Sequence, residues 1–146
     1  TNLPALSRVS GKGPTSWPAL EGQVVLLDLF ATWCGPCQLL GPHYRAMHER
    51  YASRGLTILA VSSEEPAVLS AWSKREAVDY TVASAPDERM FMDLQVPALP
   101  SAIVVDRMGI VRDVSVGYHP RAEARQKATI ESLLAQPLKP QAGVLL

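Results

Sequence analysis

Three stretches of the chain are almost wholly apolar, and each has the length of a strand buried on both faces of a sheet. They are residues 24–30, 56–61 and 102–105. Elsewhere apolar residues recur every three or four positions, and this spacing predicts helices at 37–54, 66–77, 87–94 and 121–135. Short strands are predicted at 80–83 and 110–116. Strands that alternate with helices in this way predict an α/β fold, in which helices cover both faces of a central mixed sheet that is antiparallel at one edge.

Prolines, glycines and polar clusters divide these elements. Pro42 lies inside the first long helical pattern and is expected to kink that helix, and Gly55 ends it. Residues 62–65 offer capping groups for the next helix. The chain as a whole, residues 1–146, is expected to form a single domain, with an irregular lead-in over 1–20 that has room for a short hairpin, a hairpin turn at 106–109 and a loose tail over 136–146.

The composition excludes several classes of protein. Of 146 residues, 47 % are apolar and 19 % charged, which excludes an intrinsically disordered chain. Fourteen basic and fourteen acidic side chains cancel, so nucleic acid is not an expected partner. No apolar run approaches the ~20 residues that a membrane-spanning helix requires. Because the first residue is Thr1 and not methionine, we expect that this end has been either processed or trimmed, with any signal peptide or membrane anchor removed.

The two cysteines of the chain, Cys34 and Cys37, enclose Gly35 and Pro36 directly after the first apolar strand. A bridge between them closes too short a loop to stabilise the fold much, because that stabilisation grows with loop length. At the start of a helix, however, free N–H groups and the helix dipole favour a thiolate. We therefore expect a redox pair, in which Cys34 is the exposed thiol that attacks a substrate disulfide and Cys37 is the shielded thiol that resolves the mixed disulfide.

Metal binding is the main alternative use of the two thiols. A zinc site needs about four ligands, and the chain has no second cysteine pair. His43 and His48 lie five residues apart, about 140° around a helix, so they cannot hold one metal ion together. A copper-binding protein with the thiols as soft ligands stays open as an alternative, although no His or Met lies at helical spacing beside the pair. We expect neither a metal nor a cofactor.

Asp28 is the one charged residue in the first apolar strand, on the same strand face as Leu26 and Phe30. A buried carboxylate is costly when ionised, so the pKa of Asp28 is expected to be raised. Such a group can take and return the proton of Cys37 during disulfide exchange. The alternative is a structural role, in which backbone groups at the end of the strand satisfy the carboxylate.

Asp28, residues 33–37 and Pro42 resemble the active-site segment of thioredoxins in residue type and spacing. Pro100, with Pro97 as a competing candidate, is similar to the cis-proline that faces the cysteines in that fold, and Gly117 resembles its glycine near the substrate groove. The resemblance covers most of residues 24–135.

The lead-in and the added stretch at 64–94 look like those of the TlpA/ResA-type thiol-disulfide oxidoreductases. That branch often has Glu at the place of Leu40 and Asn at the place of Asp28, so the site is more similar to thioredoxin itself. The resemblance implies a thioredoxin-like fold with an N-terminal extension and a central insertion.

The resemblance also implies a function. We expect a monomeric enzyme that works outside the cytoplasm, reduces protein disulfides and is itself reduced by an upstream thiol. Cys34, Cys37 and Asp28 are its expected catalytic residues, and substrate is expected to bind against Trp33, Gly35, Pro36, Leu99, Pro100 and Gly117. A disulfide oxidase or isomerase that uses the same pair stays open, because the partner and the compartment set the direction of exchange.

Overall fold

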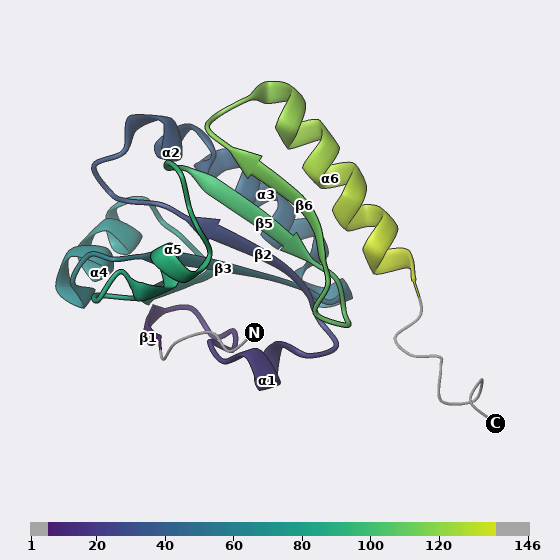
Figure 1. Ribbon diagram of the computed structural model, residues 1–146, viewed down its shortest axis with the longest axis horizontal. Helices are drawn as coiled ribbons and strands as arrows, with labels where there is room; N and C mark the ends of the chain where they lie inside the picture. Colours follow the sequence, from purple (N-terminus) through teal and green to yellow (C-terminus); the bar gives the residue numbers. More distant parts are fainter. Residues whose placement is uncertain (1–5, 137–146) are drawn as a thin grey trace.

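Two of the most apolar segments of the chain form the centre of a six-stranded sheet with the strand order β1-β4-β3-β2-β5-β6 (Figure 1). The structure, a computed structural model, describes residues 6–136. Strand β2 (Val24–Leu29) is buried along its whole length and pairs in parallel with β3 (Leu56–Ser62). Strand β5 (Ser101–Val105) flanks β2 on its other side and runs antiparallel to it. The predicted mixed sheet is therefore confirmed.

The outer strands extend the sheet at both edges. Strand β6 (Val111–Val116) pairs antiparallel with β5, as the predicted hairpin requires. Strand β4 (Thr81–Ser84) adds in parallel to β3, and β1 (Ser7–Ser10) pairs antiparallel with β4. Antiparallel pairing thus occurs at both edges, and the expectation of a single antiparallel edge is wrong.

The prediction of an irregular lead-in over residues 1–20 is also wrong, because this segment contains β1 and the helix α1 (Trp17–Leu20). The pairing that forms β1 is with β4, far along the chain, and no local pattern encodes it. The turn after β1 lies tightly on β4. Gly11 has a φ of +84°, and a Cβ at this position would lie 2.6 Å from the Cα of Thr81.

Helices cover both faces of the sheet, as predicted. On one face α3 (Gly41–Tyr51), α4 (Pro66–Arg75) and α6 (Pro120–Ala135) pack on a large apolar cluster. On the other face α1 and α5 (Arg89–Asp93) cover a smaller cluster. The long helix expected at 37–54 is broken at Leu40 into α2 (Gly35–Leu39) and α3, because Pro42 lacks the N–H that would continue the ladder. A single 3-10 turn (Ala52–Arg54) follows α3 and ends at Gly55, whose φ is +109°.

Between residues 6 and 136, every helix is too short or too polar to cross a membrane. The tail predicted at 136–146 lies outside the described residues from 137 onward.

Candidate active site

The cysteine pair lies where the buried strand β2 gives way to the helix α2. Cys34 is the N-cap residue of α2, and the backbone N–H of Cys37 donates to its Sγ atom over 3.2 Å. Pro36 occupies the first turn of the helix, as predicted. Cys34 and Cys37 are joined by a disulfide. An N–H group aimed at the Sγ atom of Cys34 favours the thiolate that forms when this disulfide opens.

Both cysteines are buried in the oxidised protein. Cys34 is 5 % exposed and Cys37 is 8 % exposed, and both belong to the large apolar cluster. The expectation that Cys34 is exposed and Cys37 shielded is therefore wrong for the oxidised state. The neighbouring Trp33 is 75 % exposed.

Asp28 lies in the middle of the sheet on the face below α3. Its neighbours on the two adjoining strands are the small residues Ala60 and Ala102, and the rings of Tyr44 and Tyr80 line the pocket into which it opens. The side chain is 5 % exposed, and its Oδ1 atom has no hydrogen-bond partner in the part of the chain that the structure describes. Burial raises the pKa of Asp28 from 3.8 to about 7. At neutral pH this carboxyl group can both accept and donate a proton.

Asp28 and Cys37 open into the same pocket of about 260 Å³. Its other walls include Gln38 and Tyr44 from the two helices that follow the cysteines. The pocket gives the buried carboxyl group and the resolving cysteine a shared route for proton exchange with solvent.

Pro100 directly precedes β5, and the Leu99–Pro100 peptide bond is cis. The competing candidate Pro97 has no cis bond. The N–H of Gly117 donates to the carbonyl oxygen of Pro100 over 2.7 Å, so the end of β6 fastens this loop. Gly117 has a φ of +80°, a left-handed conformation that favours glycine.

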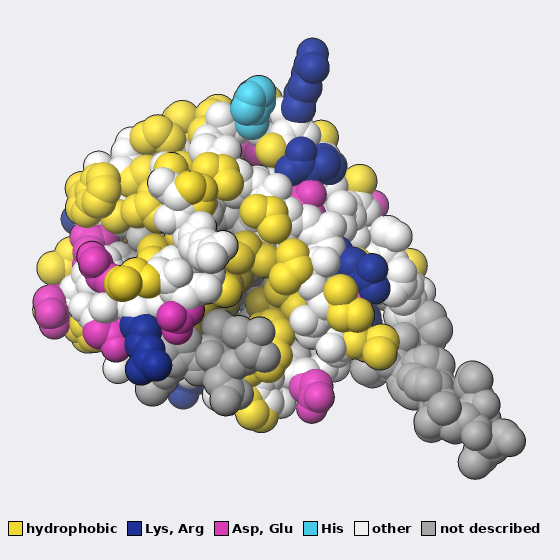
Figure 2. Space-filling view, viewed as in Figure 1, with side chains coloured by type: hydrophobic (Ala, Val, Ile, Leu, Met, Phe, Trp, Pro, Cys, Tyr) yellow, Lys and Arg dark blue, Asp and Glu magenta, His cyan; other side chains and the backbone are white. Residues whose placement is uncertain are grey.

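The surface around α2 is apolar and open. Leu39 is exposed together with Trp33, and Gly35 and Pro36 between the cysteines are exposed as well. Figure 2 shows hydrophobic side chains gathered over the end of the molecule where α2 lies. This surface, formed by residues 33, 35, 36 and 39, is called the apolar rim below. Exposed apolar patches of this kind are typical of interaction surfaces.

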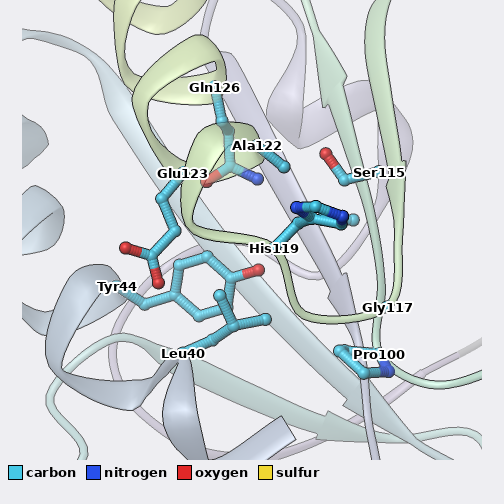
Figure 3. Close-up of a pocket in the computed structure, with 10 residues that line it drawn as sticks. Leu40, Tyr44, Pro100, Ser115, Gly117, His119, Ala122, Glu123 and Gln126 are labelled. Atoms are coloured by element: carbon cyan, nitrogen blue, oxygen red, sulfur yellow. The ribbon is translucent and has the colours of Figure 1, made fainter. Parts of the chain in front are cut away.

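A second crevice lies beside Pro100 and is lined by residues of α3, β6 and α6 (Figure 3). The ring of Tyr44 and the side chains of Ser115, His119 and Gln126 border it, and Oε1 of Gln126 accepts a 2.8 Å hydrogen bond from Nε2 of His43. Its volume of about 10 Å³ has room for roughly one water molecule, so no substrate side chain fits.

Glu64 binds the active-site loop, a role that the sequence did not reveal. Its Oε1 atom accepts the backbone N–H of Thr32 over 2.6 Å, and its Oε2 atom accepts the Thr32 hydroxyl over 2.6 Å. The hydroxyl of Ser62 donates to Oε1 as well, over 2.9 Å. Residues 62–65 were expected to offer capping groups for α4; Glu65 holds the N-cap position, but its side chain makes no cap hydrogen bond. Only the tertiary structure brings Thr32 and Glu64 together.

Gln38 and Trp72 form a second link that the sequence did not reveal. The Trp72 Nε1–H donates to Gln38 Oε1 over 2.9 Å, and Gln38 Nε2 donates to the carbonyl oxygens of Ala31 and Cys34 over 3.2 and 3.3 Å. The Trp72 ring packs on Phe30 with 4.7 Å between centroids. Gln38 thereby ties the residues on both sides of Cys34 to α4.

The described part of the chain has no candidate metal centre. Within residues 6–136, no three His, Cys, Asp or Glu side chains are grouped closely enough to hold a metal ion.

The fold and the disulfide define a thioredoxin-like oxidoreductase with a Cys-x-x-Cys pair. The chain belongs to the AhpC/TSA family, whose model matches residues 3–114. It is 28 % identical over 130 residues to the thioredoxin-like protein YneN of Bacillus subtilis, and the aligned residues cover 87 % of this chain and 75 % of YneN.

Distant homology connects the chain to thiol-disulfide oxidoreductases. It is 24 % identical over 107 residues to ResA of Geobacillus thermodenitrificans, and the aligned residues cover 73 % of this chain and 62 % of ResA. A solved thiol:disulfide interchange protein of the thioredoxin family from Chlorobium tepidum superposes with a TM-score of 0.74 at 28 % identity, covering 92 % of this chain and 98 % of that one. The fold and the cysteine pair therefore agree with the family resemblance.

Removing the carboxylate of Glu64 should loosen the active-site loop. Replacing Glu64 by Ala leaves the Thr32 N–H and hydroxyl without their acceptor, which should lower the free energy of unfolding by about 1–3 kcal/mol and speed hydrogen exchange of the Thr32 amide. Denaturant unfolding and amide exchange measure the two effects. The exposed Glu65→Ala is the matched control and should change the free energy by less than about 0.5 kcal/mol. Equal effects of the two variants would contradict this role of Glu64.

Burial of Asp28 predicts how stability depends on pH. The folded protein keeps a proton on Asp28 up to a pKa of about 7, whereas the unfolded chain loses it near 3.8, the ordinary pKa of an aspartate. The folded state therefore binds more protons between these values, and the free energy of unfolding falls as pH rises through this range, by about 4 kcal/mol in total. In the Asp28→Asn variant this loss should disappear, which denaturant unfolding at about pH 4 and about pH 8 measures. The same pH dependence in both proteins would show that the carboxyl group ionises freely in the folded state.

Proposed function

We propose that this protein reduces disulfides of protein substrates by dithiol-disulfide exchange through Cys34 and Cys37. One observation carries the proposal above the others. The cysteine pair begins a helix beside the apolar rim and the cis-Pro100 loop, with a buried carboxyl group of pKa about 7 on the pocket behind it. A site that only stabilised the fold would need neither the exposed Trp33 nor the buried Asp28.

In the first step the Cys34 thiolate attacks one sulfur of the substrate disulfide. The bond between the two substrate sulfurs breaks, one of them leaves as a thiolate, and a mixed disulfide joins Cys34 to the other. The N–H of Cys37, which is aimed at the Sγ atom of Cys34, favours the attacking thiolate. The apolar rim and the loop at Leu99 and Pro100 hold the substrate segment.

In the second step Cys37 resolves the mixed disulfide. Its thiol passes a proton to the Asp28 carboxylate, and the resulting thiolate attacks the Sγ atom of Cys34. The disulfide of Cys34 and Cys37 re-forms, and the second substrate sulfur leaves as a thiolate that takes up a proton. Two electrons pass from the protein to the substrate, and an upstream thiol must replace them.

Reduction is the proposed direction because the Gly-Pro dipeptide between the cysteines is similar to that of reducing thioredoxins. The similarity to ResA-type thiol-disulfide oxidoreductases supports a site of action outside the cytoplasm. The reduction potential of the pair tests the direction. A value near about −270 mV supports a reductant, and a value near about −120 mV would mark an oxidant.

The reductase activity itself can be tested with a disulfide-bonded protein and dithiothreitol as the electron source. The wild-type protein should accelerate reduction, and Cys34→Ser should abolish that acceleration because no attacking thiol remains. Cys37→Ser should accumulate a mixed disulfide through Cys34, visible by mass spectrometry, since the resolving thiol is missing. Accumulation in the Cys34→Ser variant instead would reverse the roles of the two cysteines.

Asp28→Asn tests proton transfer. Asparagine cannot accept the Cys37 proton, so the rate of exchange at about pH 7 should fall by roughly ten-fold or more, and the deficit should shrink at higher pH as hydroxide replaces the carboxylate. Stopped-flow measurement of the resolution step across pH gives the comparison. Identical pH profiles for the two proteins would assign Asp28 a structural role only.

A further inference from the structure

The pocket that contains Asp28 and Cys37 is separate from the surface to which protein substrates are assigned. Its lining includes Cys37 but neither Cys34 nor any residue of the apolar rim. It also excludes the loop at Leu99 and Pro100. The disulfide can therefore be reached by two routes, from the apolar rim towards Cys34 and through the pocket towards Cys37.

The sequence creates this space beneath the break between α2 and α3. The strand neighbours of Asp28 are the small residues Ala60 and Ala102. Above them, Gly41 and Pro42 line the pocket at the point where the helix is interrupted. A Cβ on Gly41 would lie 3.1 Å from Nη1 of Arg45, so the Arg45 guanidinium packs across this glycine on the pocket wall.

The walls of the pocket are held in place. Gln38 is fixed by its hydrogen bonds to Trp72, Ala31 and Cys34, and the Trp72 ring packs on Phe30. At about 260 Å³ the pocket is smaller than the roughly 300–1,000 Å³ that drug-sized ligands occupy. It therefore suits a small molecule and excludes a folded partner.

Besides Asp28, the pocket lining has one charged side chain of each sign, Arg45 and Glu76. Arg45 makes no ion pair with any described residue, and Glu76 has only a contact of 3.9 Å with Arg75, in which both side chains are well exposed. A guanidinium binds a carboxylate, and a carboxylate binds an ammonium group. Deeper in the pocket, the carboxyl group of Asp28 has an Oδ1 atom without a partner among residues 6–136. The guanidinium of Arg45 and the carboxylate of Glu76 match the carboxylate and the ammonium group of an amino acid.

We propose that the pocket binds a small amino-acid thiol of the cysteine type, with its carboxylate on Arg45, its ammonium group on Glu76 and its sulfur facing Cys37. This inference rests on the proposed function, because it identifies the chemical class of the upstream reductant. The small thiol reduces the pair at Cys37, and protein substrates are reduced at Cys34.

The exchange balances with two equivalents of the thiol. The first thiolate attacks the Sγ atom of Cys37, the bond between Cys34 and Cys37 breaks, and Cys34 leaves as a thiolate. Cys34 is the better leaving group of the two because the Cys37 N–H favours its thiolate. A second thiolate then attacks the bound ligand sulfur, which releases the symmetrical small disulfide and leaves Cys37 as a thiolate that takes a proton from Asp28.

Reduction kinetics test this assignment with cysteine and the uncharged thiol 2-mercaptoethanol as probes. The rate of reduction of the oxidised protein should saturate with cysteine and stay linear with 2-mercaptoethanol. Arg45→Gln should slow reduction by cysteine about ten-fold, the equivalent of one charge-assisted hydrogen bond, and leave reduction by 2-mercaptoethanol within about two-fold. Arg50→Gln, which removes an exposed guanidinium of the same helix outside the pocket, is the matched control and should leave both rates unchanged.

A second variant locates the reacting sulfur. In Cys34→Ser, Cys37 is the remaining thiol, and cystine should add a cysteinyl group to it at a rate that Arg45→Gln lowers, as measured by mass spectrometry. Equal cysteine rates in the Arg45→Gln and Arg50→Gln proteins, or a first adduct on Cys34 in acid-quenched wild-type protein, would overturn the proposal. Reduction of a test protein with dithiothreitol as donor does not need the pocket. Loss of this activity would therefore count against the proposed function. If this activity survives while the cysteine experiments fail, only the proposal about the pocket is wrong.

Discussion

The structure depends on one constraint, the burial of β2 on both faces and along both edges. Its six residues lie between β3 and β5, with a helical layer above and below. Such a strand favours apolar residues, because an unpaired polar group within it costs free energy. Asp28 breaks this rule in the middle of the strand. Burial raises the pKa of its carboxyl group to about 7, and in the proposed mechanism the group exchanges a proton with Cys37, which lines the same pocket.

The rigid position of β2 also fixes the cysteines. The strand ends at Leu29, and the chain needs only a short loop to reach the N-cap position of α2 at Cys34. This loop could move, but Glu64 binds Thr32 from one side and Gln38 binds the carbonyl oxygens of Ala31 and Cys34 from the other. The active site therefore combines a strand that cannot shift with a loop held by charged and amide side chains.

Much of this arrangement could be predicted from the sequence, because burial leaves a periodic pattern. The apolar strands, the helix break near Pro42, the redox pair at a helix start and the raised pKa of Asp28 all follow from local patterns and the chemistry of single residues. The pairing of β1 with β4 could not be predicted, because its four residues carry too little periodicity. The burial of Cys34 was missed for a related reason. Exposure of a helix start depends on what the rest of the fold packs against it.

The missed contacts share one origin, the segment between β3 and β5. Glu64 and Trp72 both belong to it, and they reach Thr32 and Gln38 across 32 and 34 residues of chain. Hydrogen bonds between side chains so far apart in the sequence produce no periodic pattern, since any surface helix carries similar residues. The segment also supplies Glu76, Val78 and Tyr80 to the pocket wall. The segment that supplies β4 to the sheet thus also closes one side of the candidate site, so variation in this segment changes access to Cys37 while the cysteine pair itself stays in place.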